Sequence, residues 1–214
     1  MNSVHERSDI MPNKKRRERE KSEMRELILA AANEIIAVEG FDKLSIRKIA
    51  NKIEYSPSLI YNYFEDKDEI VNNLMQRGYQ KIVTAISSVN TNIHSPEDRL
   101  KEMMKKYIEE ALQMPDEFMA AQLNKSPQAL KHTSSLYKGA SKSNTALSFL
   151  FTCLKDINKD MGDSKLELTS QIIVTSALGF ALKLIIEKDI GDEQRQSLIE
   201  YFCNEIIIRM AKGD

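Results

Sequence analysis

The sequence predicts an all-α protein with a small N-terminal domain and a larger C-terminal one, and three observations carry this prediction. Apolar residues recur at three- and four-residue steps over most of the 214 positions, the spacing that places them on one face of a helix. The chain has only 7 Gly and 5 Pro, so few breaks interrupt its helices. No segment shows the strict alternation of polar and apolar residues that marks a half-buried strand.

The first helices are delimited by serine, proline and glycine. Residues 1–20 lack apolar periodicity and are predicted to form a basic, disordered arm. The first helix follows Ser22 and ends at Gly40, because serine caps exposed N–H groups and glycine accepts the left-handed conformation at a helix end. A short helix follows Ser45. Another starts at Ser56-Pro57, where proline takes a position whose N–H would otherwise lack a partner.

Longer helices follow, for a total of about nine. The fourth is predicted from Lys67 to about residue 89, opened by Asp66 with Glu69 three residues later, as in a capping box. Ser95-Pro96 opens the fifth and Pro115 ends it. The stretch 116–140 predicts only short helical pieces. The remaining helices are expected at 143–160, at about 165–188 and at about 193–212.

Three short helices within about 40 residues, the last two joined by a tight turn, suggest a helix-turn-helix. In the third helix Ile60 and Phe64 are four residues apart and are predicted to face inward. The residues left at its start and outer face are Tyr55, Ser56, Pro57, Ser58, Tyr61, Asn62 and Tyr63. Hydroxyl groups bind phosphate oxygens and asparagine can pair with an adenine edge, so this face is suited to DNA.

Five short runs in one order carry a family resemblance. They are Arg25 to Ala32, Gly40-Phe41, Leu44 to Ala50, Tyr55 to Phe64 and Lys67 to Ile70. In order and spacing this region, roughly 23 to 72, resembles the DNA-binding domain of the tetracycline-repressor (TetR) family. The resemblance covers about a quarter of the chain, and beyond residue 75 the family shares architecture and little sequence.

The resemblance implies roles for individual residues. Ser45 would cap the second helix and contact phosphate, and Arg47 would contact a base or phosphate. Tyr61, Tyr63 and Lys67 would contact the DNA backbone. Ser56, Pro57 and Ser58 would begin the recognition helix. Pro57, Ser58 and Asn62 depart from the family's frequent residues, so the operator sequence stays open.

The resemblance also implies that residues 71–214 enclose an effector pocket and pair two subunits through the last two helices. The aromatic and methionine residues expected at a pocket for a small apolar effector are Met103, Met104, Tyr107, Phe118, Met119, Tyr137, Phe149 and Phe180. Ordinary core packing is an equally good interpretation of each one alone. Phe202 and Ile206 are expected at the homodimer interface, unless the closing helices form only the core of their own subunit.

The expected organisation is therefore a basic arm at 1–20, a helix-turn-helix domain at 21–70 and an effector-binding and dimerisation domain at 71–214. The function implied by the resemblance is that of a repressor that a small apolar ligand releases from a palindromic operator. One alternative is a DNA-binding protein of the same fold controlled by a protein partner, or organising DNA. The other is an oligomeric helical protein whose helix-turn-helix is no longer used to bind DNA.

Composition and motifs favour no other class of protein. A net charge of −1 argues against a wholly basic nucleic-acid binder, although a local basic patch is compatible with it. No catalytic or nucleotide-binding motif is present, so neither an enzyme nor a cofactor is expected. Cys153, Cys203 and His132 show no metal-ligand spacing. Both cysteines are interpreted as buried packing, with a redox sensor as the alternative. No signal peptide or membrane span is evident, which favours the cytoplasm.

Overall fold

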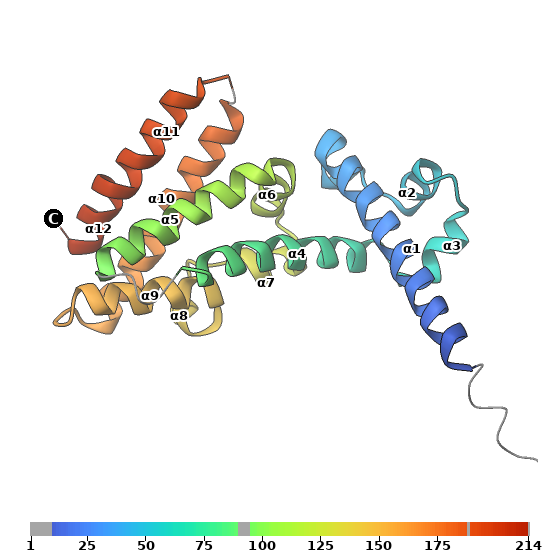
Figure 1. The fold of residues 1–214 in the computed structure, drawn as a ribbon, viewed down its shortest axis with the longest axis horizontal. Coiled ribbons are helices and arrows are strands. Elements are labelled where there is room, and N and C mark those ends of the chain that lie inside the picture. The colour runs from blue at the N-terminus through green and yellow to red at the C-terminus, as the bar shows by residue number, and fades with distance from the viewer. Residues whose placement is uncertain (1–9, 90–94, 188, 214) are drawn as a thin grey trace, which may run out of the picture. The chain divides into compact units, whose positions relative to one another are not determined.

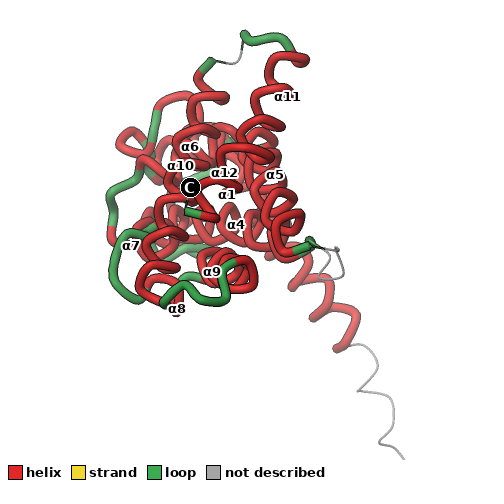
Figure 2. Tube along the Cα trace, turned by 90° about the vertical axis from the view of Figure 1, so that its left-hand side faces the viewer, coloured by secondary structure: helices red, strands yellow, loops and turns green. Residues whose placement is uncertain are grey.

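The computed structural model describes residues 10–89, 95–187 and 189–213. All regular structure in these ranges is helical (Figures 1 and 2), which confirms the all-α prediction. The chain divides into two compact units, Met1–Leu74 and Met75–Asp214. Helix α4 (Lys67–Ser87) begins in the first unit and continues into the second.

The first unit is a small helical domain built around α1. Its elements are α1 (Ile10–Glu39), the 3₁₀ turn η1 (Phe41–Lys43), α2 (Ile46–Lys52), α3 (Pro57–Tyr61) and the first turns of α4. Helix α2 packs on both α1 and α3. The fully buried side chains at the centre of the unit are Ile28, Ala32, Ile49, Ala50, Ile60 and Ile70. They fall at the helical spacing that the sequence predicts for one inward face per helix.

Helix α1 begins earlier than the sequence predicts. Residues 10–20, predicted as a disordered arm, are helical, and residues 1–9 lie outside the described residues. Residues 14–23 are all exposed, so no apolar face holds this part of the helix. Instead Arg16 pairs with Glu20 and Arg19 with Glu23, both at 3.4 Å and four residues apart. Such pairs stabilise a solvated helix without leaving an apolar pattern in the sequence.

Gly40 ends α1 where the sequence predicts. Its φ of 83° lies in the left-handed region, and its N–H donates to the carbonyl of Ile36 at 2.9 Å. A residue with a Cβ would be strained there, because that atom approaches the following carbonyl oxygen. Gly40 therefore lets the chain leave α1 and enter η1.

The second unit is a bundle of longer helices with a continuous apolar core. Its elements are α5 (Pro96–Gln113), α6 (Pro115–Leu123), α7 (Pro127–Thr133), α8 (Ala140–Ser143), α9 (Thr145–Ile157), α10 (Asp163–Ile186), α11 (Asp192–Tyr201), the π-helical segment η2 (Phe202–Ile206) and α12 (Ile207–Lys212). Helix α5 packs on both α9 and α10. The segments α11, η2 and α12 run as one continuous rod beside α10 (Figure 1).

The stretch 116–140 contains short helices, which is why its periodicity is weak in the sequence. Ser126 begins α7, with its hydroxyl accepting from the N–H of Ala129 at 3.2 Å. Gly139, at φ 87°, precedes α8. Each helix is too short for an apolar stripe of several turns, so periodicity in the sequence does not define it.

Helix α10 alone, in the part of the chain that the structure describes, is long and apolar enough to cross a membrane by composition. One face of it is buried in the core of the second unit, through Leu166, Ile173, Ala177 and Leu184. Two polar residues of the helix, Ser170 and Gln171, are also buried and hydrogen-bonded to backbone carbonyls. These contacts are those of a core helix, as the sequence analysis expected.

Candidate DNA interface and effector cavity

Serine caps fix the starts of α2 and α3. The hydroxyl of Ser45 accepts from the N–H of Lys48 at 3.2 Å, and that of Ser56 accepts from the N–H of Leu59 at 3.3 Å. Pro57 follows Ser56 as the first residue of α3. Both caps lie where the sequence predicts. They fix the first turn of α3, in which Ser56, Pro57 and Ser58 are exposed to the solvent.

The tight turn between α2 and α3 depends on a strained residue. Glu54 has a φ of 61°, and it is the one described residue other than glycine with a positive φ. The next residue, Tyr55, donates its N–H to the carbonyl of Ala50 at 2.9 Å, which closes the end of α2. The sequence gives no warning of this strain, because glutamate is unusual at a left-handed position.

Helix α3 has one buried and one exposed face, as predicted. Ile60 and Phe64 are buried at 0% and 1% exposure. Tyr61 is 56% exposed and Tyr55 is 46% exposed. The remaining predicted DNA-facing residues are Ser56, Pro57, Ser58 and Asn62, which are exposed, and Tyr63, which is half-buried. An outer surface of phenol, hydroxyl and amide groups can bind phosphate oxygens and base edges.

Arg25 of α1 holds the end of α3, a role that the sequence analysis missed. Its guanidinium lies 4.0 Å from the centre of the Phe64 ring and donates to the carbonyl of Tyr63. It also lies 3.4 Å from the carboxylate of Glu69 in α4. The carboxylate of Glu69 accepts in turn from the N–H of Glu65 at 2.6 Å. One arginine therefore ties together the helices that present the exposed face of α3.

The cations beside α3 fall into two groups. Lys48 and Lys52 of α2 pair with Glu39 and Glu34 of α1, the second pair at 2.7 Å. Arg47 is exposed and Lys67 half-buried, and neither forms an ion pair with any described residue. Unpaired cations retain their full charge toward phosphate, so Arg47 and Lys67 are the better candidates of the four.

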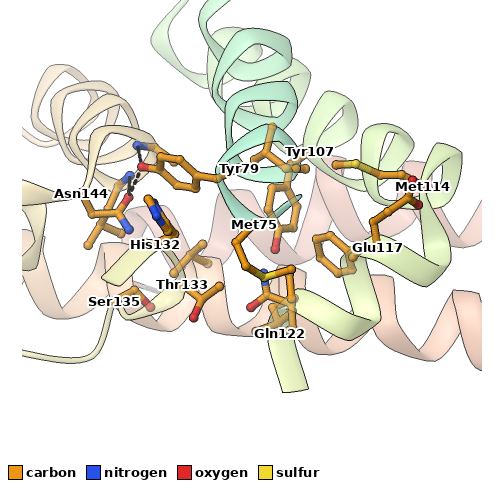
Figure 3. A pocket seen from close by; sticks show the side chains of 18 of the residues that line it. Met75, Tyr79, Tyr107, Met114, Glu117, Gln122, His132, Thr133, Ser135 and Asn144 are labelled. Carbon is orange, nitrogen blue, oxygen red and sulfur yellow. Dashed lines mark hydrogen bonds between the residues drawn. The ribbon is translucent and has the colours of Figure 1, made fainter. Parts of the chain in front are cut away.

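The second unit contains a cavity of about 90 Å³ between α4, α5, α6, α7, α9 and α10 (Figure 3). Its apolar lining includes Met75, Ile82, Met114, Ala121, Leu147, Val174 and Leu178. Its polar and aromatic lining includes Tyr79, Tyr107, Glu117, Phe118, Gln122, His132, Thr133, Ser135 and Asn144. A mostly apolar cavity with a few polar groups is the usual form of a small-molecule site.

Of the eight residues that the sequence suggests for a pocket, Tyr107 and Phe118 line this cavity. The other six do not. Met103 and Met104 are buried in the core, Met119 is half-buried, and Tyr137 and Phe149 are exposed. Phe180 stacks on Phe202 at 4.4 Å. The sequence analysis missed Met75, Tyr79 and Ile82, whose spacing along α4 is the signal that could have found them.

The polar end of the cavity is largely saturated by its own hydrogen bonds. The hydroxyl of Tyr79 donates to the side-chain oxygen of Asn144 at 3.1 Å and accepts from the N–H of Ala146 at 3.3 Å (Figure 3). The ring of His132 lies 5.9 Å from that of Tyr79. Burial, and secondarily the charge of Lys131, lowers the pKa of His132. The imidazole is therefore neutral at pH 7.

The outer faces of the closing helices carry exposed apolar side chains. Leu168, Ile172 and Ile186 of α10 are exposed on one side of the helix, together with Gly179. Leu198 and Tyr201 are exposed on α11. Of the residues predicted at a dimer interface, Phe202 is half-buried against Phe180 and Ile206 is half-buried.

Both cysteines are free and buried. The thiol of Cys153 donates to the carbonyl of Pro96 at 3.3 Å. Burial raises the pKa of both thiols, that of Cys203 to about 12. A buried thiol with a raised pKa is a poor nucleophile, which favours packing over redox sensing. In the described ranges, no group of three or more His, Cys, Asp or Glu could hold a metal ion.

Known proteins share both the first unit and the fold. The family model for bacterial regulatory proteins of the tetR family matches residues 28–74. An uncharacterized HTH-type transcriptional regulator of Bacillus subtilis, YuxN, is 27% identical over 101 residues, which are 47% of this chain and 34% of that protein. A second HTH-type regulator, from Haemophilus influenzae, is 29% identical over 66 residues, 31% of this chain and 35% of that protein. The aligned part thus spans about a third of each curated relative.

Solved structures match over nearly the whole fold. A tetR-family regulatory protein from Rhodococcus RHA1 has a TM-score of 0.68 at 15% identity, covering 87% of this chain and 96% of that one. The fatty acid degradation regulator FadR of Bacillus halodurans has a TM-score of 0.66 at 18% identity, covering 87% and 94%. At such identities these two structures support the fold, while the family model identifies the first unit. Residues 28–74 therefore match the tetR family of bacterial regulatory proteins, and the fold of the chain is similar to that of solved structures from this family.

Proposed function

We propose that this protein is a cytoplasmic, dimeric transcriptional repressor that binds a palindromic operator and is released from it by a small apolar ligand. The exposed face of α3 carries this proposal. It presents Tyr55, Tyr61 and Asn62 to the solvent from a helix whose other face is buried. Unpaired Arg47 and Lys67 lie in the same unit and supply the charge that attracts phosphate. A regulator of this kind performs no catalysis, in keeping with the family.

A dimer is suited to binding a palindromic operator, because two copies of α3 related by a twofold axis would contact two equivalent half-sites. The apolar stripe of α10, at Leu168, Ile172, Gly179 and Ile186, has the spacing of a helix-packing face. Glycine in such a stripe allows close approach of a second helix. We therefore place the partner subunit on this stripe and on Leu198 and Tyr201 of α11, in preference to Phe202.

Helix α4 supplies a route from ligand to DNA. Met75, Tyr79 and Ile82 of α4 line the cavity, and Lys67 begins the same helix. A ligand that favours one position of α4 shifts the population of the dimer toward that position. If the helix-turn-helix segments of the two subunits are then wrongly spaced for the operator, the affinity for DNA falls.

Selection of bound fragments from random duplex DNA tests this proposal. The dimer should enrich a palindrome, and Tyr61→Phe should weaken binding to it by about 5- to 150-fold, the effect of one lost hydrogen bond in each of two subunits. Tyr137→Phe removes the hydroxyl of an exposed tyrosine in the second unit and is the matched control. If no sequence is enriched and binding is independent of salt, the chain is not a DNA-binding regulator.

A further inference from the structure

The hydroxyl of Tyr107 belongs to the most buried of the cavity's polar residues that form no side-chain hydrogen bond within the described structure. Tyr107 is 6% exposed, and its ring meets that of Phe118 edge-on at 5.9 Å. No other described group forms a hydrogen bond with its hydroxyl. Every side-chain nitrogen or oxygen in the described structure that is fully shielded from solvent has a hydrogen-bond partner. Because the Tyr107 oxygen has no partner, it is not fully shielded, and it opens onto the cavity that Tyr107 lines. Figure 3 shows the side chain extending beside Met75, with no bond drawn to it.

Two neighbouring hydroxyl groups of the cavity differ from Tyr107 in this respect. The hydroxyl of Tyr79 is held by Asn144 and Ala146, and that of Thr175 donates to the carbonyl of Gln171 at 2.7 Å. A buried hydroxyl without a partner loses the hydrogen bonds that it made in water. Burial raises the pKa of Tyr107, so it remains a neutral phenol that can donate. A molecule in the cavity with an acceptor atom at this point would restore the missing bond.

The charges around the cavity restrict that molecule further. Glu117 is the one carboxylate among the lining residues, and no Lys or Arg is among them. His132 is neutral at pH 7 because its pKa is lowered. An anionic ligand would therefore lose its hydration and gain no cationic partner among these lining residues. The protein offers such a ligand only neutral donors, of which Tyr107 is the most buried.

We propose that the cavity binds an uncharged, largely apolar molecule whose hydrogen-bond acceptor receives the Tyr107 hydroxyl. The inference rests on the proposed function, because it names the chemical class of the effector. It places a neutral acyl compound, such as an amide or ester, ahead of a free carboxylate. At about 90 Å³ the cavity is smaller than the ~300–1,000 Å³ of drug-sized sites. Flexible Met75 and Met114 can move to enlarge it for a longer molecule.

Three probes of similar size and different charge test the proposal on the 214-residue protein without DNA. They are hexanamide, hexanoate and hexylamine, with binding measured by calorimetry at pH 7. Hexanamide should bind, hexanoate at least about ten-fold more weakly, and hexylamine more weakly than hexanamide. Tyr107→Phe should weaken hexanamide by about 2- to 12-fold. The matched control Tyr137→Phe, on an exposed tyrosine that does not line the cavity, should leave it unchanged.

Each result decides the matter. Equal or tighter binding of hexanoate or hexylamine overturns the choice of an uncharged ligand. Unchanged hexanamide affinity in a folded Tyr107→Phe protein overturns the role of the hydroxyl, and no binding of any probe overturns both. The probe comparison on the unmodified protein holds even if the variant does not fold. Operator binding by the ligand-free dimer, measured in parallel, shows whether the proposed function fails as well or only this inference.

Discussion

Replacing Lys67 and Lys52 by alanine, one at a time, compares two cations. Lys67 is free to bind phosphate, whereas the charge of Lys52 is already neutralised by the protein. Lys67 stands at the start of α4 without an ion pair to any residue the structure describes, whereas the ammonium of Lys52 lies 2.7 Å from Glu34. Both lysines belong to the first unit. A free cation that contacts a phosphate displaces a condensed counterion from the DNA, but a neutralised one displaces little.

The size of the effect follows from the number of counterions released. Each phosphate contact contributes about 0.9 to the slope of log K against log salt concentration, so two copies of Lys67 in a dimer contribute about 1.8. Lys67→Ala should reduce the steepness of that slope by this amount. Between about 0.1 and 0.3 M salt the affinity gap between the unmodified protein and Lys67→Ala should therefore narrow about 7-fold. Lys52→Ala should change the slope by less than about 0.4.

Fluorescence anisotropy with a labelled palindromic duplex at five salt concentrations gives the slopes. Sedimentation of each variant confirms that the dimer is intact, so a lost interface is not mistaken for a lost contact. Equal slopes for the two variants, or a larger change for Lys52→Ala, would show that the ion pairs of the structure do not decide which cations reach DNA.

Four further predictions concern the fold and the assembly. Glu54→Gly should raise the free energy of unfolding by up to about 1 kcal/mol by relieving the left-handed strain, while Glu54→Ala should give no gain in a urea melt. Arg25→Ala should lower it by about 1–2 kcal/mol, since the Phe64 contact and the bond to the Tyr63 carbonyl are lost together; a smaller change would mean that Arg25 does not hold α3. Ile172→Asp should convert the dimer to monomers at micromolar concentration by sedimentation, with exposed Val38→Asp of α1 as the control; a dimer that persists would place the interface elsewhere. Cys203 should resist a thiol reagent at pH 8, far below its pKa of about 12, until the protein unfolds. Rapid labelling of the folded protein would reopen the redox alternative.

The local sequence was sufficient to predict the helices of the helix-turn-helix and their ends. Ser45, Ser56-Pro57 and Gly40 act at helix ends through bonds to residues three or four positions away, so their spacing alone identifies them. Ile60 of α3 and Phe64, which follows the end of that helix, are both buried as predicted. The N-terminal part of α1 was not predicted, because charged pairs and not apolar spacing accompany that part of the helix.

Only the tertiary structure decided which residues far apart in the chain come into contact. Arg25 meets Tyr63 and Glu69 only once α1 lies against α3 and α4. The same holds for the cavity, which gathers Tyr79 from α4, Tyr107 from α5 and His132 from α7. Periodicity shows that a side chain faces inward, but every inward face looks alike in sequence whether it meets a neighbour or a void. For that reason Met103 and Tyr107, one helical turn apart, both looked like pocket residues, and only the packing assigns the first to the core and the second to the cavity.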